Sequence, residues 1–157
     1  TKTPSDIVAT LNDALAEANE SNMFCTFFLG ILNLKTGEME YCNAGHNAPI
    51  MIKPTGEVSF IEVEPNIPLG IFESFPYQSQ KCTIEHGTSL FLYTDGVTEA
   101  ESVNKELYSE TKLLKTLEKD RDMNVPNVVE NILASIKEHS FGAEQSDDIT
   151  ILLFQYK

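Results

Sequence analysis

The spacing of apolar side chains predicts a helix near the start of the chain. They recur at every fourth position from residue 7 to residue 15, which places them on one face of a helix over residues 4–20. Thr3, Pro4 and Asp6 stand where a capping hydroxyl, a first-turn proline and a capping-box carboxylate are expected. Thr3 should therefore cap this helix.

Short apolar runs separated by turn residues predict a series of strands after the helix. We expect a buried strand at 24–34, a turn at 35–38, strands at 39–45, 48–53 and 57–63, a loop at 64–74, and strands at 75–84 and 89–94. Helical spacing returns at 106–119 and 126–138, and the apolar run at 147–156 predicts a last strand that is central or well covered. This order is typical of an α+β fold in which antiparallel β-sheets are layered with helices, and not of a βαβ series.

Length and composition indicate a single domain over residues 1–157. No apolar run reaches the roughly 18 residues that a membrane-spanning helix needs, and no signal peptide is visible, so we expect a cytoplasmic location. The odd number of widely spaced cysteines, Cys25, Cys42 and Cys82, favours buried thiols over disulfides or a zinc site. The formal net charge of −13 disfavours binding to nucleic acid.

Acidic residues occur where one predicted strand ends and another begins. Asp95 and Gly96 follow the strand at 89–94, and Asp147 and Asp148 stand at the start of the last strand. If these strands are antiparallel neighbours, the three carboxylates converge at one edge of a sheet, where their mutual repulsion favours a bound cation. Oxygen ligands favour Mg²⁺, Mn²⁺ or Ca²⁺. Each motif alone is also explained as an ordinary turn, since Asp-Gly is a common hairpin pair.

Four motifs in a fixed order resemble those of one protein family. They are "NAGHN" at 43–47, "IPLGI" at 67–71, "YTDGVTEA" at 93–100 and "SDDITILLF" at 146–154. Together they are similar to the bacterial metal-dependent serine/threonine phosphatases of the PPM type, related to protein phosphatase 2C. The nearest branch is that of the sporulation stage II protein E and sigma-factor-regulator phosphatases. The resemblance covers nearly the whole chain and implies an α-β-β-α sandwich.

The resemblance also implies a metal site and its residues. Members of the family hold two Mn²⁺ or Mg²⁺ ions mostly through aspartates, and water activated by the ions attacks the phosphorus of phosphoserine or phosphothreonine. Asp95 and Asp147 match the family's metal ligands and would act in catalysis through the ions. Asp148 matches a neighbouring position with an indirect role, and Gly96 would let the backbone approach the site closely.

The "NAGHN" motif leaves two roles open for His46. The imidazole could donate a proton or contact phosphate, or it could belong to a hydrogen-bonded turn, which we favour. Gly45 can adopt a backbone conformation closed to other residues, and Asn43 and Asn47 can bond their own backbone. Thr150 is expected to form hydrogen bonds locally, beside the acidic residues.

Two further aspartate motifs of the family, which precede its equivalent of the helix at 4–20, have no counterpart in this sequence. We therefore expect the chain to be the C-terminal two-thirds of a phosphatase domain, a truncated sandwich with half of a two-ion site. Such a piece should bind divalent ions weakly. Uncovered sheet edges and apolar patches would favour its self-association.

Three functions follow from these observations. In the first, the intact parent dephosphorylates a phosphorylated bacterial regulatory protein of the anti-sigma-factor antagonist type, under an upstream sensor or receiver domain, and this piece alone is inactive. In the second, the chain is a non-catalytic protein-binding module that retains the phosphatase fold. A plain structural domain with turn aspartates is disfavoured by the number of matched motifs.

Overall fold

The computed structural model describes residues 2–120 and 124–157, which form two compact units. Unit 1 consists of Thr1–Ala48 and Glu62–Glu85, and unit 2 of Pro49–Ile61 and His86–Lys157. Each unit combines helix with antiparallel sheet, so the predicted α+β class is confirmed. In the described part of the chain, no helix has both the length and the apolar character that crossing a membrane requires.

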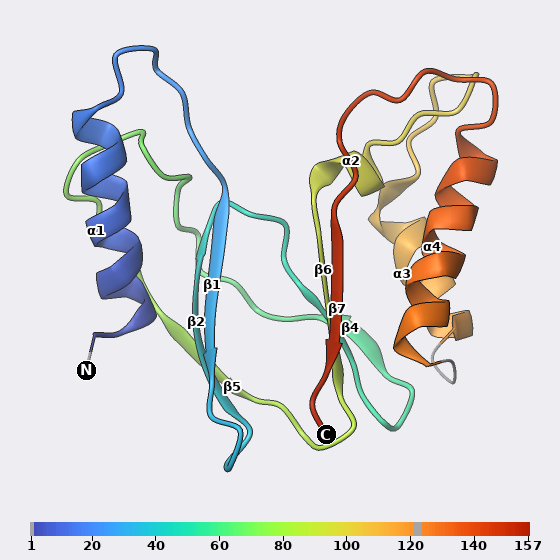
Figure 1. The fold of residues 1–157 in the computed structure, drawn as a ribbon, viewed down its shortest axis with the longest axis horizontal. Helices are drawn as coiled ribbons and strands as arrows, with labels where there is room; N and C mark the ends of the chain where they lie inside the picture. The colour runs from blue at the N-terminus through green and yellow to red at the C-terminus, as the bar shows by residue number, and fades with distance from the viewer. Residues whose placement is uncertain (1, 121–123) are drawn as a thin grey trace. The chain divides into compact units, whose positions relative to one another are not determined.

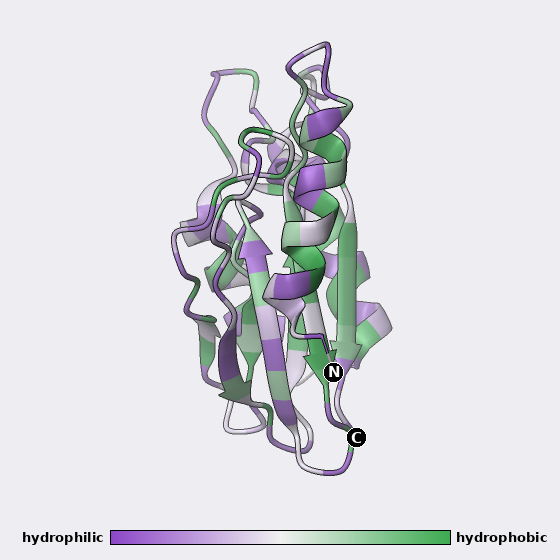
Figure 2. Ribbon diagram, turned by 90° about the vertical axis from the view of Figure 1, so that its left-hand side faces the viewer, coloured by the Kyte–Doolittle hydropathy of each residue, from purple (hydrophilic) through white to green (hydrophobic). Residues whose placement is uncertain are grey.

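Unit 1 is a three-stranded sheet with one helix beside it. Its elements are α1 (Pro4–Glu17), β1 (Phe27–Leu32), β2 (Glu38–Ala44) and β5 (Gln80–Thr83), and the sheet order is β1-β2-β5. The predicted capping box is confirmed, because the Asp6 amide donates to the Thr3 hydroxyl and the Thr3 amide donates to the Asp6 carboxylate. Figure 2 shows hydrophobic and hydrophilic segments alternating along α1. The apolar face buries Val8 in one cluster with Cys42 and Ala44 of β2.

Unit 2 is a four-stranded antiparallel sheet packed against two helices. Its elements are β3 (Ile50–Ile52), β4 (Val58–Phe60), β6 (Ser89–Tyr93), α2 (Asp95–Thr98), α3 (Ser109–Asp120), α4 (Val125–His139) and β7 (Ile151–Gln155), in sheet order β4-β3-β6-β7. Phe91 of β6, Leu113 of α3 and Ile132 of α4 belong to one cluster and are completely buried. Figure 1 shows β6 and β7 side by side, with the short α2 at one end of the pair. This core fixes the end of β6 and the start of β7. Asp147 and Asp148 were expected at the start of the last strand, but β7 begins at Ile151 and both lie in the loop before it.

Two strands are less covered than their apolar content predicts. The segment at 24–34 was expected to be a buried strand, but β1 lies at the edge of its sheet, Ile31 is 46% exposed and Phe24 is 66% exposed. The last strand was expected to be central or well covered, but β7 is also an edge strand and Leu152 is 58% exposed. Both predictions are wrong, because apolar content reports side-chain character and does not report how many strands lie alongside.

Several elements are shorter than predicted, and for β5 and α3 the structure shows the local reason. The strand expected at 75–84 shortens to β5, because the backbone of Gln78 bonds the Asn66 side chain and not a neighbouring strand. The helix expected from residue 106 begins at Ser109, because Leu107 forms a β-bridge with Glu101.

The three cysteines are free thiols, as expected, but they are not uniformly buried. Cys42 is buried, Cys82 is half-buried and Cys25 is exposed. Burial raises the pKa of the Cys42 thiol to about 11. The expectation of burial is therefore wrong for Cys25, which precedes β1 and lies outside the ladder of that edge strand.

Candidate metal site at the ends of β6 and β7

The end of β6 and the start of β7 lie together, so the antiparallel pairing on which the expected acidic site depends is present. In the antiparallel register Tyr93 is opposite Ile151, and the Thr94 amide extends the ladder by donating to the Thr150 carbonyl at 3.1 Å. Asp95 comes directly after this last pair on one strand, and Asp148 stands two residues before Thr150 on the other. The hairpin-corner alternative for Asp95 is wrong, because this residue begins α2.

The Thr94 hydroxyl joins the two acidic segments. It donates to the Asp148 carbonyl at 3.1 Å and accepts a hydrogen bond from the Thr150 amide at 3.0 Å. The local bonding expected for Thr150 is therefore confirmed, through its backbone. Thr94 is the N-cap residue of α2 but makes no side-chain cap bond to that helix. Sequence reasoning gave Thr94 no role, since it counted this residue as the end of the strand at 89–94 and its partner lies 54 residues further along the chain.

Gly96 allows the two segments to approach each other at backbone distance. A Cβ atom at this position would meet the carbonyl carbon of Asp148 at 3.0 Å and its carbonyl oxygen closer still. Any side chain would therefore push the start of α2 away from the segment that carries Asp147 and Asp148. The neighbour that the structure shows is the Asp148 backbone, and the role expected for Gly96 at the metal site stays a prediction.

Two polar side chains of the loop before β7 fix Asp147 further. The Ser146 hydroxyl donates to the Glu99 carbonyl at the end of α2, at 3.3 Å. The Gln145 side-chain amide donates to the Asp147 carbonyl at 2.8 Å. Sequence reasoning missed both residues, because their partners become apparent only once α2 and this loop are placed together.

The carboxylates of Asp95 and Asp147 are exposed, and each is oriented by the amide that follows it. Asp95 Oδ1 accepts from the Gly96 amide at 3.0 Å, and Asp147 Oδ1 accepts from the Asp148 amide at 2.7 Å. Asp148 is exposed as well. None of the ion pairs found among the described residues involves these three aspartates. The site is thus a pair of oriented carboxylates on adjacent backbone segments.

As a ligand set for an ion, this arrangement is partial. Carboxylate and carbonyl oxygens suit a hard cation such as Mg²⁺ or Mn²⁺. Within the described residues, however, no three His, Cys, Asp or Glu side chains are grouped so that they could hold a metal ion. The expected convergence of three carboxylates is therefore wrong. The ladder brings the backbones together, but the carboxylates of Asp95 and Asp147 each accept a hydrogen bond from the next amide in their own segment.

The "NAGHN" segment lies in unit 1 and forms a turn. Asn43 accepts a hydrogen bond from the His46 amide at 2.9 Å and donates to the His46 carbonyl at 2.8 Å. Gly45 has a φ of +71°, and a Cβ atom there would meet Pro68 at 2.6 Å. The His46 ring is within hydrogen-bond distance of the Thr26 hydroxyl, at 3.2 Å. The favoured interpretation of this motif as a hydrogen-bonded turn is confirmed for Asn43 and Gly45.

The fold defines a class of protein. The structure of the SiaA-PP2C domain of Pseudomonas aeruginosa matches with a TM-score of 0.81 and 18% identity, over 99% of this chain and 61% of that chain. The structure of RsbX in complex with magnesium matches with a TM-score of 0.66 and 21% identity, over 98% of this chain and 65% of that chain. The fold is therefore that of phosphatases of the 2C type.

The sequence comparisons place the chain in a family within this class. The family described as stage II sporulation protein E (SpoIIE) matches residues 1–157, and the chain belongs to that family. Protein IcfG of Synechocystis sp. is 30% identical over 146 residues, which are 92% of this chain and 23% of that protein. The phosphoserine phosphatase RsbU of Bacillus subtilis is 28% identical over 156 residues, which are 98% of this chain and 45% of that protein. The chain spans less than half the length of both relatives.

Proposed function

We propose that the chain is the part of a metal-dependent serine/threonine protein phosphatase that supplies Asp95 and Asp147 to the metal centre. One observation carries this proposal. In a chain of the SpoIIE family, the two aspartate segments are joined at backbone distance by the Thr94 hydroxyl and by the absence of a side chain at Gly96. The magnesium complex of RsbX, which shares the fold, supports the binding of a divalent cation by a protein of this fold.

The residues of the site have separate roles in this proposal. In each of the two carboxylates, Oδ1 accepts a hydrogen bond from the next backbone amide. This hydrogen bond orients the carboxylate and leaves Oδ2 to bind Mn²⁺ or Mg²⁺. Asp148 acts indirectly, because its carbonyl receives the Thr94 hydroxyl and so keeps the Asp147 segment beside α2. When bound, the ions would supply the Lewis acidity that polarises a water molecule and the phosphoryl oxygens.

The remaining ligands of a two-ion centre would come from the two further aspartate motifs that the family carries before its equivalent of α1. On this proposal the chain is the C-terminal two-thirds of the phosphatase domain. Alone it would bind divalent ions with a dissociation constant on the order of 10⁻³ M, because water fills most of the coordination shell. It would therefore be inactive without the preceding segment.

The substrate that we propose is a phosphorylated serine or threonine on a bacterial regulatory protein of the anti-sigma-factor antagonist type. The similarity to the phosphoserine phosphatase RsbU supports this class of substrate. A sensor or receiver domain upstream in the parent would control the activity, and the reaction would take place in the cytoplasm.

Phosphatase assays on the chain joined to the preceding segment of its parent test the proposal. With Mn²⁺ and a phosphoserine peptide, Asp95→Asn and Asp147→Asn should each lower kcat at least about 100-fold, since each removes a charged ligand of the catalytic ions. Glu110→Gln, which removes an exposed charge on α3, is the matched control and should stay active. Unchanged activity in both aspartate variants would contradict the proposal. A chain that binds the peptide but never turns it over would instead be a non-catalytic binding module.

A further inference from the structure

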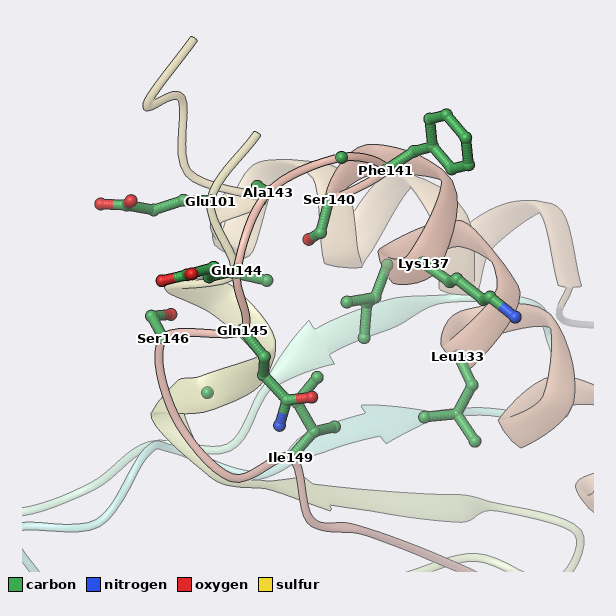
Figure 3. A pocket seen from close by; sticks show the side chains of 14 residues that line it. Glu101, Leu133, Lys137, Ser140, Phe141, Ala143, Glu144, Gln145, Ser146 and Ile149 are labelled. Carbon is green, nitrogen blue, oxygen red and sulfur yellow. The ribbon is translucent and has the colours of Figure 1, made fainter. Parts of the chain in front are cut away.

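A cavity of about 540 Å³ opens beside α2, and all of its lining residues belong to unit 2. It lies between α2, the last turns of α4 and the loop at 140–149 (Figure 3). Its walls are mainly apolar, and they include Leu133, Ile136, Ala100 and Ile149. The metal site described above uses none of these apolar residues.

The lining of the cavity includes direct sequence neighbours of the proposed metal ligands. Gly96, which follows Asp95, lines it from α2. Gln145 and Ser146 line it from the loop, and the chain then continues directly into Asp147. A molecule in the cavity would therefore lie against the same loop that carries this aspartate.

Ser140 provides the cavity with a polar group that has no partner. Its hydroxyl oxygen is buried and makes no hydrogen bond within the described part of the chain. Figure 3 shows the Ser140 side chain on the inner side of the loop, whereas Phe141 points away. A buried hydroxyl without a partner is unfavourable and uncommon in folded proteins. A ligand that brings a hydrogen-bonding group into the cavity would remove this cost.

The charges around the cavity indicate which part of a phosphoprotein fits it. Glu101 and Glu144 contribute carboxylates to its lining, and Lys137 is the single basic residue there. The Glu101 carboxylate is paired with Lys105 at 2.6 Å, so the lining carries little net charge. The apolar walls therefore suit an aliphatic side chain better than a phosphate. The phosphate of the same segment would then lie beyond Gly96, toward Asp95 and its cations.

We propose that this cavity is a recognition pocket for the protein substrate. It takes an aliphatic side chain that stands a few residues from the phosphorylated serine, and a backbone amide or carbonyl of that segment bonds the Ser140 hydroxyl. The inference rests on the proposed function, because the occupant is the substrate of that function. It adds a sequence preference, and it couples binding of the substrate to the order of the loop that carries Asp147.

Peptide binding to the whole chain, followed by NMR of its methyl groups, tests the pocket. The probes are phosphoserine peptides of alanine and serine that carry one leucine at successive positions on either side of the phosphoserine. Leucine at one preferred position should tighten binding at least about tenfold over the all-alanine peptide, because it buries one aliphatic side chain. The methyl signals of Leu133 and Ile149 should shift on binding of that peptide.

Two variants and one control separate recognition from stability. Ala143→Trp would fill the cavity from the loop and should abolish the advantage of leucine. Ser140→Ala removes the unpaired hydroxyl, so it should weaken peptide binding while leaving the melting temperature unchanged or higher. Leu107→Ala changes an exposed leucine of unit 2 that does not line this cavity, and it should bind as the wild type does.

The outcomes distinguish this inference from the proposed function. If no leucine position tightens binding, or if the Ala143→Trp chain binds as the wild type does, the pocket assignment is overturned even where the extended protein turns over phosphopeptides. If the extended protein shows no turnover with Mn²⁺ while the shifts at Leu133 and Ile149 persist, the proposed function fails and the cavity remains a peptide site.

Discussion

At the scale of single residues, one hydroxyl holds the two halves of the site together. Thr94 Oγ1 donates to the carbonyl of Asp148 and accepts from the amide of Thr150. A threonine hydroxyl has one proton and two lone pairs, so a single atom can serve both partners. The position of Asp147 relative to Asp95 therefore depends on a residue that is not one of the proposed metal ligands.

Thr94→Val tests this dependence, because valine keeps the shape of threonine and lacks its hydroxyl. The Asp148 carbonyl and the Thr150 amide would lose their partner, which should cost about 1–2 kcal/mol of unfolding free energy. Affinity for Mn²⁺ should fall as well. Thr94→Ser retains the hydroxyl and should stay close to the wild type in both respects. Urea denaturation measures the stability, and equal midpoints for valine and wild type would contradict this account.

Gly96→Ala tests the close approach of the backbones. The new Cβ atom would overlap the carbonyl of Asp148, and backbone cannot move aside as the end of a side chain can. We expect a loss of about 1–3 kcal/mol in unfolding free energy. In Gly30→Ala the nearest atom is the flexible Met39 Sδ at 3.3 Å, so this control should cost less. If the two variants have the same denaturation midpoint, the approach of the backbones at Gly96 is not tight.

At the scale of elements, the capping box of α1 is a stabilising feature that the local sequence specifies. Thr3→Ala should lower stability by about 1 kcal/mol, and Thr3→Ser should not. Hydrogen bonds from the Thr3 amide and hydroxyl lower the pKa of Asp6 below 3.8. The carboxylate therefore stabilises the helix above that pH, and the effect is lost as pH falls through the lowered pKa. Thermal unfolding of the wild type and of Asp6→Asn at neutral and at acid pH measures this, and a difference between the two that does not shrink at acid pH would contradict it.

The elements that sequence predicted well are those that depend on near neighbours. The capping box joins Thr3 to Asp6, three residues away, and the acidic motif at Asp95 consists of consecutive residues. The edge positions of β1 and β7 depend on which strands lie alongside, which apolar content does not report. The role of Thr94 depends on a contact with Asp148, and periodicity carries no information about such distant pairs.

At the scale of the whole molecule, exposed apolar side chains predict self-association. Leu15, Met23 and Phe24 line one shallow pocket of unit 1, and all three are exposed. Exposed apolar groups of this kind commonly mark interaction surfaces. Light scattering should show a mass above that of the monomer as the protein concentration rises. The Phe24→Ser variant should show a smaller mass than the wild type at the same concentration. A monomeric mass at every concentration would contradict the prediction.

In the proposed function Asp95 and Asp147, both in unit 2, together bind a divalent cation. Titration of the ¹⁵N-labelled chain with Mn²⁺ tests this most directly, because the paramagnetic ion broadens the signals of nearby amides even when binding is weak. We predict that the amides of Gly96 and Asp148 broaden first, and that Asp95→Asn and Asp147→Asn each remove the effect while Glu110→Gln does not. Broadening spread evenly over the acidic surface, or unchanged in the two aspartate variants, would contradict the account.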